Sequence, residues 1–361
     1  LGLLCALLAL AALTPVVSGE GVHRGAMPGA PTKARERDVD LQLYDRVTER
    51  LRHGENYYAA IAIEHRASRY PLHPGFAVRL PTLALIEAQL PPPVDPAKGG
   101  AAEALLATGL LIAVMIAWWQ RLGDEPGGRG VRPWALAGLF IGAQIGTIGY
   151  FFVLHELWAG GLVALALGLH RPGQGKWLGA LLVTALALAI RELVLPFALL
   201  MAASALWHHR KAEAVAWLGL ICLFVAGLGL HLHHVASLVS PDDPAGASWL
   251  TLRGLSGWLS MIVLSSNLRF LPTVLAGPLV VLMLFGWSGW RSPLGSFATL
   301  LFLGYGLAFM IAGRADNWYW GMTIAPAMFA GLALVPMVAK GLWQAAFPRT
   351  TLATGEALEQ G

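Results

Sequence analysis

Charged residues are scarce in this sequence. Aspartate, glutamate, lysine and arginine make up only 13% of its 361 residues, whereas a soluble domain contains about 25% of them. Hydrophobic residues account for 56% of the chain, and the mean hydropathy is +0.60. This is not the composition of a water-soluble domain.

Cysteine is also rare, and clusters of basic residues are missing. The two cysteines, Cys5 and Cys222, both fall inside apolar segments, where a thiol acts as a small hydrophobic group. They therefore indicate neither a disulfide nor a metal site. The net charge of +4 comes without the alternation of Lys or Arg with aromatic residues that suits a nucleic-acid groove. We therefore expect no nucleic acid among the partners.

Long apolar blocks dominate the sequence instead. Blocks of roughly 16–20 residues have the length that a helix needs to cross about 30 Å of hydrocarbon, and they predict an all-α polytopic membrane protein with about ten transmembrane helices. After a first apolar run at residues 1–17, the expected spans are 101–119, 134–152, 157–169, 177–190, 193–207, 214–232, 270–285, 295–312 and 322–339.

The same pattern divides the chain into four parts. Residues 1–18 form the first transmembrane helix, with a signal-peptide core as the alternative, and we expect this helix to be truncated because the chain starts at Leu1 instead of Met. Residues 19–100 form a large extracytoplasmic loop with amphipathic helices. Residues 101–340 form the transmembrane bundle, and residues 341–361 form a cytoplasmic tail.

The loops between the expected spans differ in charge. Alternate short loops are basic, and the positive-inside rule assigns them to the cytoplasm; their basic residues include Arg121, Arg129, Arg132, His170, Arg171, Lys176, Arg210, Lys211, Arg291, Lys340 and Arg349. The opposite side receives the segment 38–81, the tight turns at 155–156 and 191–192, the loop 231–269 and the segment 314–320. The spans beside the two tight turns are short, so these turns are expected to lie in a cavity below the membrane surface.

The segment 38–81 concentrates acidic residues, tyrosine, proline and arginine. Periodicity predicts two amphipathic helices here, at 41–52 and 58–69, lying along a membrane surface. Asp38 and Asp40 are candidate general bases, because a carboxylate held ~3 Å from an acceptor hydroxyl can take its proton. The alternatives for Asp40 are an N-cap of the first helix or a solvated charge. An isolated Asp-x-Asp is a weak metal motif, so we predict no metal site and no definite cofactor; a divalent cation is compatible with the motif but not implied by it.

Two further turns carry charges at membrane depth, His155-Glu156 and Arg191-Glu192. Such charges usually pair or line a functional cavity. Glu156 and Arg191 either form an ion pair that ties two hairpins together, or line a polar pocket with His155 and Glu192. The two interpretations are compatible.

Four arginines are candidates for binding a phosphate, because a guanidinium group offers a planar fork of donors: Arg79, Arg191, Arg269 and Arg314. A lone arginine at the end of a span is alternatively an interfacial anchor. Arg314 is followed by Asp316, Asn317 and the aromatic residues 318–320, which suit either an interfacial belt or the stacking of a sugar ring.

The acidic first external loop, its amphipathic helices and the multi-span bundle together resemble the GT-C superfamily of membrane glycosyltransferases. The succession Asp40-Leu41-x-Leu43-Tyr44, Gly54-x-x-Tyr57-Tyr58 and Tyr70-Pro71 is similar to the polyprenyl-phosphate-dependent mannosyltransferase branch, which includes glycosyltransferase family 87 and related bacterial membrane proteins. The motifs lie within 38–81, and the likeness in architecture covers nearly the whole chain.

This resemblance implies the inverting transfer of a sugar from a polyprenyl-phosphate-linked donor to a lipid or glycan acceptor. It places the reaction among membrane lipids, at the extracytoplasmic face of the bacterial cytoplasmic (inner) membrane. It implies Asp40 as the general base, with Asp38 as the second choice, and Arg191 or Arg314 as the ligand of the leaving phosphate. The substrate-binding residues that we expect beside them are Tyr44, Tyr57, Tyr58, Arg79, His155, Glu156, Glu192, Asp316 and Asn317.

The chain departs from the superfamily in being short and in having no separate soluble C-terminal domain. A transporter or flippase is an alternative; it would need charges near the midplane, broken helices and repeats. Pro196, Pro272 and Pro278 provide breaks, but no repeat is visible. A non-catalytic membrane scaffold is a third possibility, and a polysaccharide polymerase or ligase with a lipid-diphosphate donor is a fourth.

Overall fold

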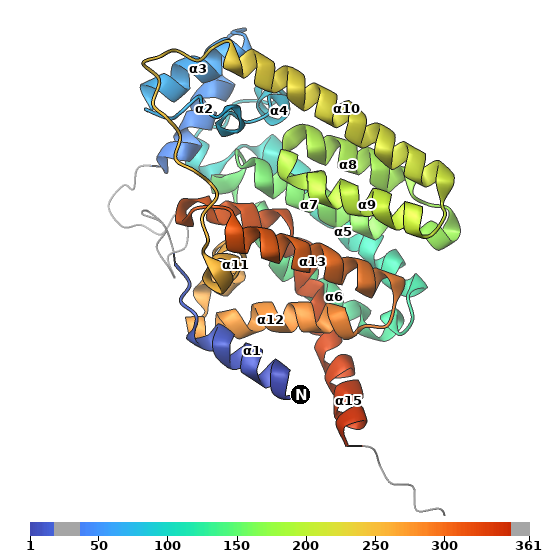
Figure 1. Ribbon diagram of the computed structural model, residues 1–361. Helices are drawn as coiled ribbons and strands as arrows, with labels where there is room; N and C mark the ends of the chain where they lie inside the picture. Colours follow the sequence, from blue (N-terminus) through green and yellow to red (C-terminus); the bar gives the residue numbers. More distant parts are fainter. Residues whose placement is uncertain (18–36, 348–361) are drawn as a thin grey trace, which may run out of the picture.

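The computed structural model describes residues 1–17 and 37–347, and within these ranges the chain is helical, with isolated bridges in place of β-strands. Figure 1 shows a bundle of helices with a small helical layer, α2 to α4, at one end. Helix α10 runs along the bundle and reaches this layer, while α15 projects from the bundle at another side. The predicted all-α fold class is confirmed for the described residues. The parts of the predicted loop and tail at 19–36 and 348–361 lie outside them.

The bundle is built from helices of about three turns or more. They are α1 (Gly2–Leu13), α5 (Ala101–Asp124), α6 (Gly128–Ala143), α7 (His155–Leu169), α8 (Leu178–Ile190), α9 (Leu195–Trp207), α10 (Lys211–Ala236), α11 (Gly254–Leu264), α12 (Thr273–Gly289), α13 (Pro293–Ile311) and α15 (Val335–Ala346). Short 3-10 segments join several of them, among them η4 (Gly149–Phe151), η6 (Glu192–Val194), η8 (Ala315–Thr323) and η9 (Phe329–Leu334).

Four segments of the described chain are long and apolar enough to cross a membrane: Pro96–Asp124, Lys211–Ala236, Pro293–Ile311 and Ala325–Ala346. Six further apolar helices have only 10–17 residues. Because a helix rises 1.5 Å per residue, roughly 20 residues are needed to span the hydrocarbon core. The six shorter helices do not reach this length. The prediction of a membrane protein is supported in this coarser form, with four candidate spans, and the count of about ten spans is not established.

Two predicted segments differ from the structure. The expected loop 231–269 contains the buried helix α11, which has 11 residues and is too short to match the length expected of a span. The expected span 322–339 is interrupted, because Pro326 and Pro336 each stand in the first turn of a new helix, α14 (Ala325–Met328) and α15. Proline is tolerated in a first turn but cannot continue a helix from the preceding turn.

The two amphipathic helices predicted in the first loop are present as α2 (Val39–Arg52) and α3 (Tyr57–Ala67). With α4 (Thr82–Ala88) they enclose a small core that includes Leu43, Val47 and Ile61. Val235 from the end of α10 packs into the same core. The apolar faces of α2 and α3 are therefore buried within the protein, whereas the sequence suggested that they would lie on a membrane surface.

Three of the basic turns predicted on a common side, those after α5, α7 and α9, meet at one end of the bundle. Arg171 lies 3.5 Å from the carboxylate of Asp124 at the end of α5. His170, in the turn between α7 and α8, is 2.7 Å from Glu213 in the first turn of α10. The structure thus brings these loops together as the charge pattern predicts. Their location in the cytoplasm stays a prediction.

Helix α12 and the segment η9 contact each other directly through their backbones at Gly286. A Cβ atom at this position would lie 1.9 Å from the carbonyl oxygen of Gly331, so Gly286→Ala must force the two segments apart. We expect the substitution to destabilise the protein by about 1–3 kcal/mol, measured as a lower midpoint of thermal unfolding in detergent.

The matched control is Gly219→Ala on α10, where a Cβ atom would meet no described atom within 4 Å. Its midpoint should be unchanged or higher, because alanine stabilises a helix interior by roughly 0.5–1 kcal/mol relative to glycine. A midpoint for Gly286→Ala equal to that of the unaltered protein would contradict the close contact.

Candidate functional site

A cavity of about 880 Å³ lies between the α2–α4 layer and the bundle, and we call it the main cavity. Its walls come from segments far apart in the sequence: the start of α2, residues 70–79, the turn before α7, residues 246–249 and η8. Of the predicted site residues, those that line it are Asp38, Asp40, Tyr44, Arg79, Arg314, Asp316 and Asn317. The segments 37–79 and 314–320, far apart in the sequence, therefore share one site.

Asp40 is the second residue of α2, and its carboxylate accepts a hydrogen bond from the Tyr70 hydroxyl. Burial raises the pKa of Asp40 above its usual range, and the Tyr70 hydrogen bond and the positive charge of Arg79 oppose this only in part. A carboxylate with a raised pKa is a stronger base at neutral pH. The geometry is thus suitable for accepting a proton from a hydroxyl in the main cavity.

Asp38, not Asp40, occupies the N-cap position of α2, so the N-cap interpretation of Asp40 is wrong. The Asp38 side chain makes no capping hydrogen bond and is exposed. Its backbone N–H donates to the Tyr150 hydroxyl over 3.1 Å. Among the described residues, no three His, Cys, Asp or Glu side chains are arranged to hold a metal ion.

Arg79 is a buried cation of the main cavity wall. Its Nη2 atom lies 3.4 Å from the Tyr319 hydroxyl and 3.7 Å from Glu156 Oε1. The backbone carbonyl of Arg79 accepts a hydrogen bond of 2.6 Å from the Tyr57 hydroxyl. Both contacts of Nη2 are long, so the guanidinium group retains donors for an anionic ligand.

Arg314 stands at a more exposed part of the same wall. Its Nε and Nη2 atoms pair with the two oxygens of Asp316 at 3.2 and 2.9 Å. Asn317 accepts a hydrogen bond from the Arg314 backbone and donates through Nδ2 to the Tyr319 hydroxyl over 3.3 Å. Tyr319 thereby connects this turn to Arg79.

Glu156 and Arg191 form an ion pair behind the wall of the main cavity. Arg191 Nε donates to Glu156 Oε1 over 2.6 Å, and both side chains are 1% exposed. Arg191 also donates to Glu192. The interpretation of this pair as a tie between two hairpins is confirmed. None of these three residues lines the main cavity, because Arg79 and its neighbours stand in front of them.

His155 and Tyr58 also lie outside the main cavity. The His155 ring packs against the ring of Tyr44, with 5.4 Å between centroids, and both of its nitrogens lack a hydrogen-bond partner among the described residues. Tyr58 stacks on His234 of α10, with 5.0 Å between centroids, and its hydroxyl is 3.2 Å from Nδ1 of His231. Tyr58 thus joins α3 to α10.

The lining of the main cavity includes residues that were not among the predicted site residues, for example Arg37, Tyr70, Trp249 and Tyr319. Tyr70 and Tyr319 stand inside recognisable motifs, Tyr70-Pro71 and the aromatic segment 318–320. Their hydroxyl partners, Asp40 and Arg79, are distant in the sequence, so no local pattern could have identified these contacts.

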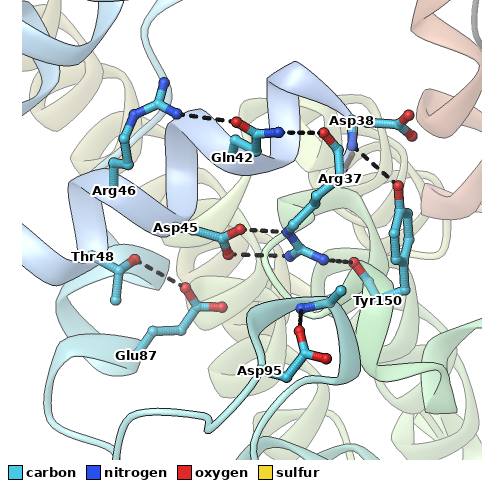
Figure 2. Close-up of polar contacts among 10 residues, drawn as sticks. Arg37, Asp38, Gln42, Asp45, Arg46, Thr48, Glu87, Asp95 and Tyr150 are labelled. Atoms are coloured by element: carbon cyan, nitrogen blue, oxygen red, sulfur yellow. Dashed lines mark hydrogen bonds and ion pairs between the residues drawn. The ribbon is translucent and has the colours of Figure 1, made fainter. Parts of the chain in front are cut away.

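A smaller cavity of about 300 Å³ adjoins the main cavity, and Arg37 lines both. Figure 2 shows Arg37 held by Asp45, with 3.1 Å between Nη2 and Oδ1, and by the Tyr150 carbonyl at 2.9 Å. Deeper in this cavity the Thr48 hydroxyl donates to Glu87 Oε2 over 3.3 Å. Burial and the nearby carboxylate of Glu103 raise the pKa of Glu87 to about 8.

Glu87 should make the stability of the protein depend on pH. In the unfolded chain its pKa is near 4.5, so between pH 4.5 and about 8 only the folded protein keeps its proton. The contribution of Glu87 to stability is therefore highest below this window and decreases as the pH rises through it. We expect Glu87→Gln to flatten this dependence, so that its unfolding midpoint exceeds that of the unaltered protein at the upper end. Parallel curves for the two proteins would contradict the raised pKa.

The Glu156–Arg191 pair provides a second test. Glu156→Gln leaves two buried guanidinium groups without their shared carboxylate, and breaking a buried pair in this way destabilises by about 3–5 kcal/mol. Glu55→Gln is the control, because Glu55 pairs with Arg50 at 3.0 Å near the surface, where such pairs contribute ~1 kcal/mol or less. Equal unfolding midpoints for the two variants would show that the buried pair is not needed for stability.

Comparison of the chain with protein-family models, with curated proteins and with solved structures gives no match. The functional conclusion therefore rests on the geometry of the main cavity and on the sequence motifs that meet in it.

Proposed function

We propose that the protein is an integral-membrane glycosyltransferase. It transfers a sugar from a polyprenyl-phosphate-linked donor to a hydroxyl of a lipid or glycan acceptor, at the extracytoplasmic face of a bacterial inner membrane. The observation that carries the proposal is the presence of a partly buried carboxylate, Asp40, and a buried guanidinium, Arg79, in the wall of one large cavity. This pairing supplies a proton acceptor and an anion-binding group for one reaction.

The size and walls of the main cavity support this function. Its volume of about 880 Å³ lies within the roughly 300–1,000 Å³ that is typical of small-molecule sites. Trp249, Trp318 and Trp320 form part of its wall and offer flat apolar faces to a sugar ring. A donor with a lipid chain would reach this cavity from the membrane, since nucleotide sugars are not available outside the cytoplasm.

In the proposed reaction, the acceptor hydroxyl loses its proton to the Asp40 carboxylate as its oxygen attacks the anomeric carbon of the donor. The bond between this carbon and the phosphate oxygen breaks, and polyprenyl phosphate leaves with the electron pair. A single displacement inverts the anomeric configuration. The hydrogen bond from Tyr70 to Asp40 orients the base, which is needed because proton transfer requires close approach of the two oxygens.

Arg79 is the best-placed residue to stabilise the leaving phosphate as negative charge develops on it. Arg191, a candidate from the resemblance, is engaged by Glu156 and Glu192 behind the cavity wall. Arg314 lines the cavity but is paired with Asp316 through two of its nitrogens. We therefore assign the phosphate to Arg79, with Arg314 as a second contact at the more exposed part of the wall.

Replacement of Asp40 tests the proposal. We expect Asp40→Asn to lower transfer of a labelled sugar from polyprenyl-phosphate donors by roughly a hundredfold or more, the usual contribution of a general base. The rate of the unaltered protein should fall at acid pH, because Asp40 acts only when deprotonated. Asp38→Asn should have a smaller effect, since Asp38 is exposed.

Asp242→Asn serves as the control for loss of one exposed negative charge and should transfer sugar at the normal rate. Thermal unfolding of each variant separates a catalytic defect from misfolding. Normal transfer by folded Asp40→Asn protein, or no donor consumption by the unaltered protein, would overturn the proposal.

A membrane transporter is the second candidate. It is favoured by the interrupted segment from η8 to η9, which borders the main cavity, since discontinuous helices are common at transporter sites. A transporter would move a lipid-linked sugar across a vesicle membrane without changing it, and Asp40→Asn would leave this flux largely intact.

A further inference from the structure

The smaller cavity is lined by none of the residues to which the chemistry of the proposed transfer is assigned, yet buried polar side chains line its walls. It is enclosed by α2, the end of α4, the linker before α5 and the residues 149–153. It meets the main cavity at Arg37, which lines both. A group bound in it would therefore lie next to a group bound in the main cavity.

Two buried carboxyl groups in this cavity each have one oxygen atom without a partner in the part of the chain that the structure describes. Glu87 and Glu103 are each 5% exposed, and Glu87 Oε1 and Glu103 Oε2 have no hydrogen-bond partner among the described residues. The Nε atom of Arg52, a third lining residue, is likewise buried and unpartnered within the described chain. Buried polar atoms of native proteins are rarely left unsatisfied, so these three atoms indicate a ligand in the cavity.

Glycine residues give the cavity its shape. A Cβ atom at Gly100 would lie 2.0 Å from Glu103 Oε2, so the absence of a side chain at Gly100 makes room for this carboxylate. A Cβ atom at Gly149 would lie 1.8 Å from the carbonyl oxygen of Lys98. The linker before α5 and the turn before α7 can therefore close on each other to form one wall.

The charges around the cavity define the chemistry of the ligand. Arg37 is paired with Asp45, and Arg52 is paired with Glu49 at 3.2 Å. An anion would meet guanidinium groups whose charge is already balanced by these carboxylates, and it would be repelled by the carboxylate of Glu103. An ammonium ion would satisfy the carboxylates, but it has no acceptor for the N–H of Arg52.

A hydroxyl group both donates and accepts hydrogen bonds. We propose that the smaller cavity is a second binding site, for a neutral, hydroxyl-rich group such as a sugar ring, which donates to Glu103 and accepts from Arg52. The raised pKa of Glu87 favours its protonated form at neutral pH. This form also finds a hydrogen-bond partner in such a ligand. If the proposed function holds, this group belongs to the acceptor, with its reactive hydroxyl directed past Arg37 toward Asp40.

The test measures binding without any donor. The full-length protein is placed in lipid nanodiscs, so that no sugar-based detergent competes, and methyl glucoside is titrated with ligand-observed NMR. Inorganic phosphate and methylammonium are the comparison ligands. We expect saturable binding of the glucoside and no binding of the two ions at this site.

Two variants locate the site. Glu103→Gln keeps the shape of the side chain and should weaken glucoside binding roughly tenfold or more, because it removes a charged acceptor. Gly100→Ala should weaken it as well, by displacing the Glu103 carboxylate. Gly109→Ala, on the helix α5 that carries Glu103, is the matched control, since a Cβ atom there would meet no described atom within 4 Å, and it should bind normally.

The outcomes separate this proposal from the proposed function. Normal glucoside binding by Asp40→Asn, combined with loss of transfer, supports both. Binding that depends on Glu103, in a protein that never consumes a donor, supports the sugar site and overturns the glycosyltransferase. The sugar site itself is overturned by the absence of glucoside binding, by preferential binding of either ion, or by binding that is lost in Asp40→Asn and kept in Glu103→Gln.

Discussion

The buried carboxylate of Glu156 is the interaction on which the arrangement of the site depends. It is held by Arg191 at 2.6 Å and approached by Arg79 at 3.7 Å. An unpaired charge at this depth is strongly destabilising, so the first turn of α7, the end of α8 and the segment before α4 must lie together. These elements form the support behind the main cavity and orient Arg79 into its wall.

This arrangement joins the small helical layer to the bundle. Tyr44 of α2 packs on His155, next to Glu156, and the hydroxyl of Tyr319 in η8 lies beside Arg79. Residues from distant parts of the sequence thereby become neighbours across one cavity. The smaller cavity follows from the same packing, because η4 and the linker before α5 are in close backbone contact at glycine positions in its wall.

Several features of the site were predictable from local sequence. The pairing of Glu156 with Arg191 follows from the high free energy of unpaired charges within a membrane protein. Periodicity predicts helices at 41–52 and 58–69, and the structure has them at 39–52 and 57–67. The helix α11 was missed because its 11 residues are fewer than a membrane span requires. The position of Arg191 behind the cavity wall was not predictable, because it depends on where the distant residue Arg79 lies.

The sequence by itself determined the membrane character of the chain, its helical class and the gathering of charged turns, because composition and apolar length control which segments leave water. Only the tertiary structure decided that Arg79 instead of Arg191 faces the main cavity, that Tyr70 holds Asp40, and that Glu87 and Glu103 meet in a second cavity. These facts depend on side-chain packing between distant segments, and local periodicity carries no information about which partners such segments find.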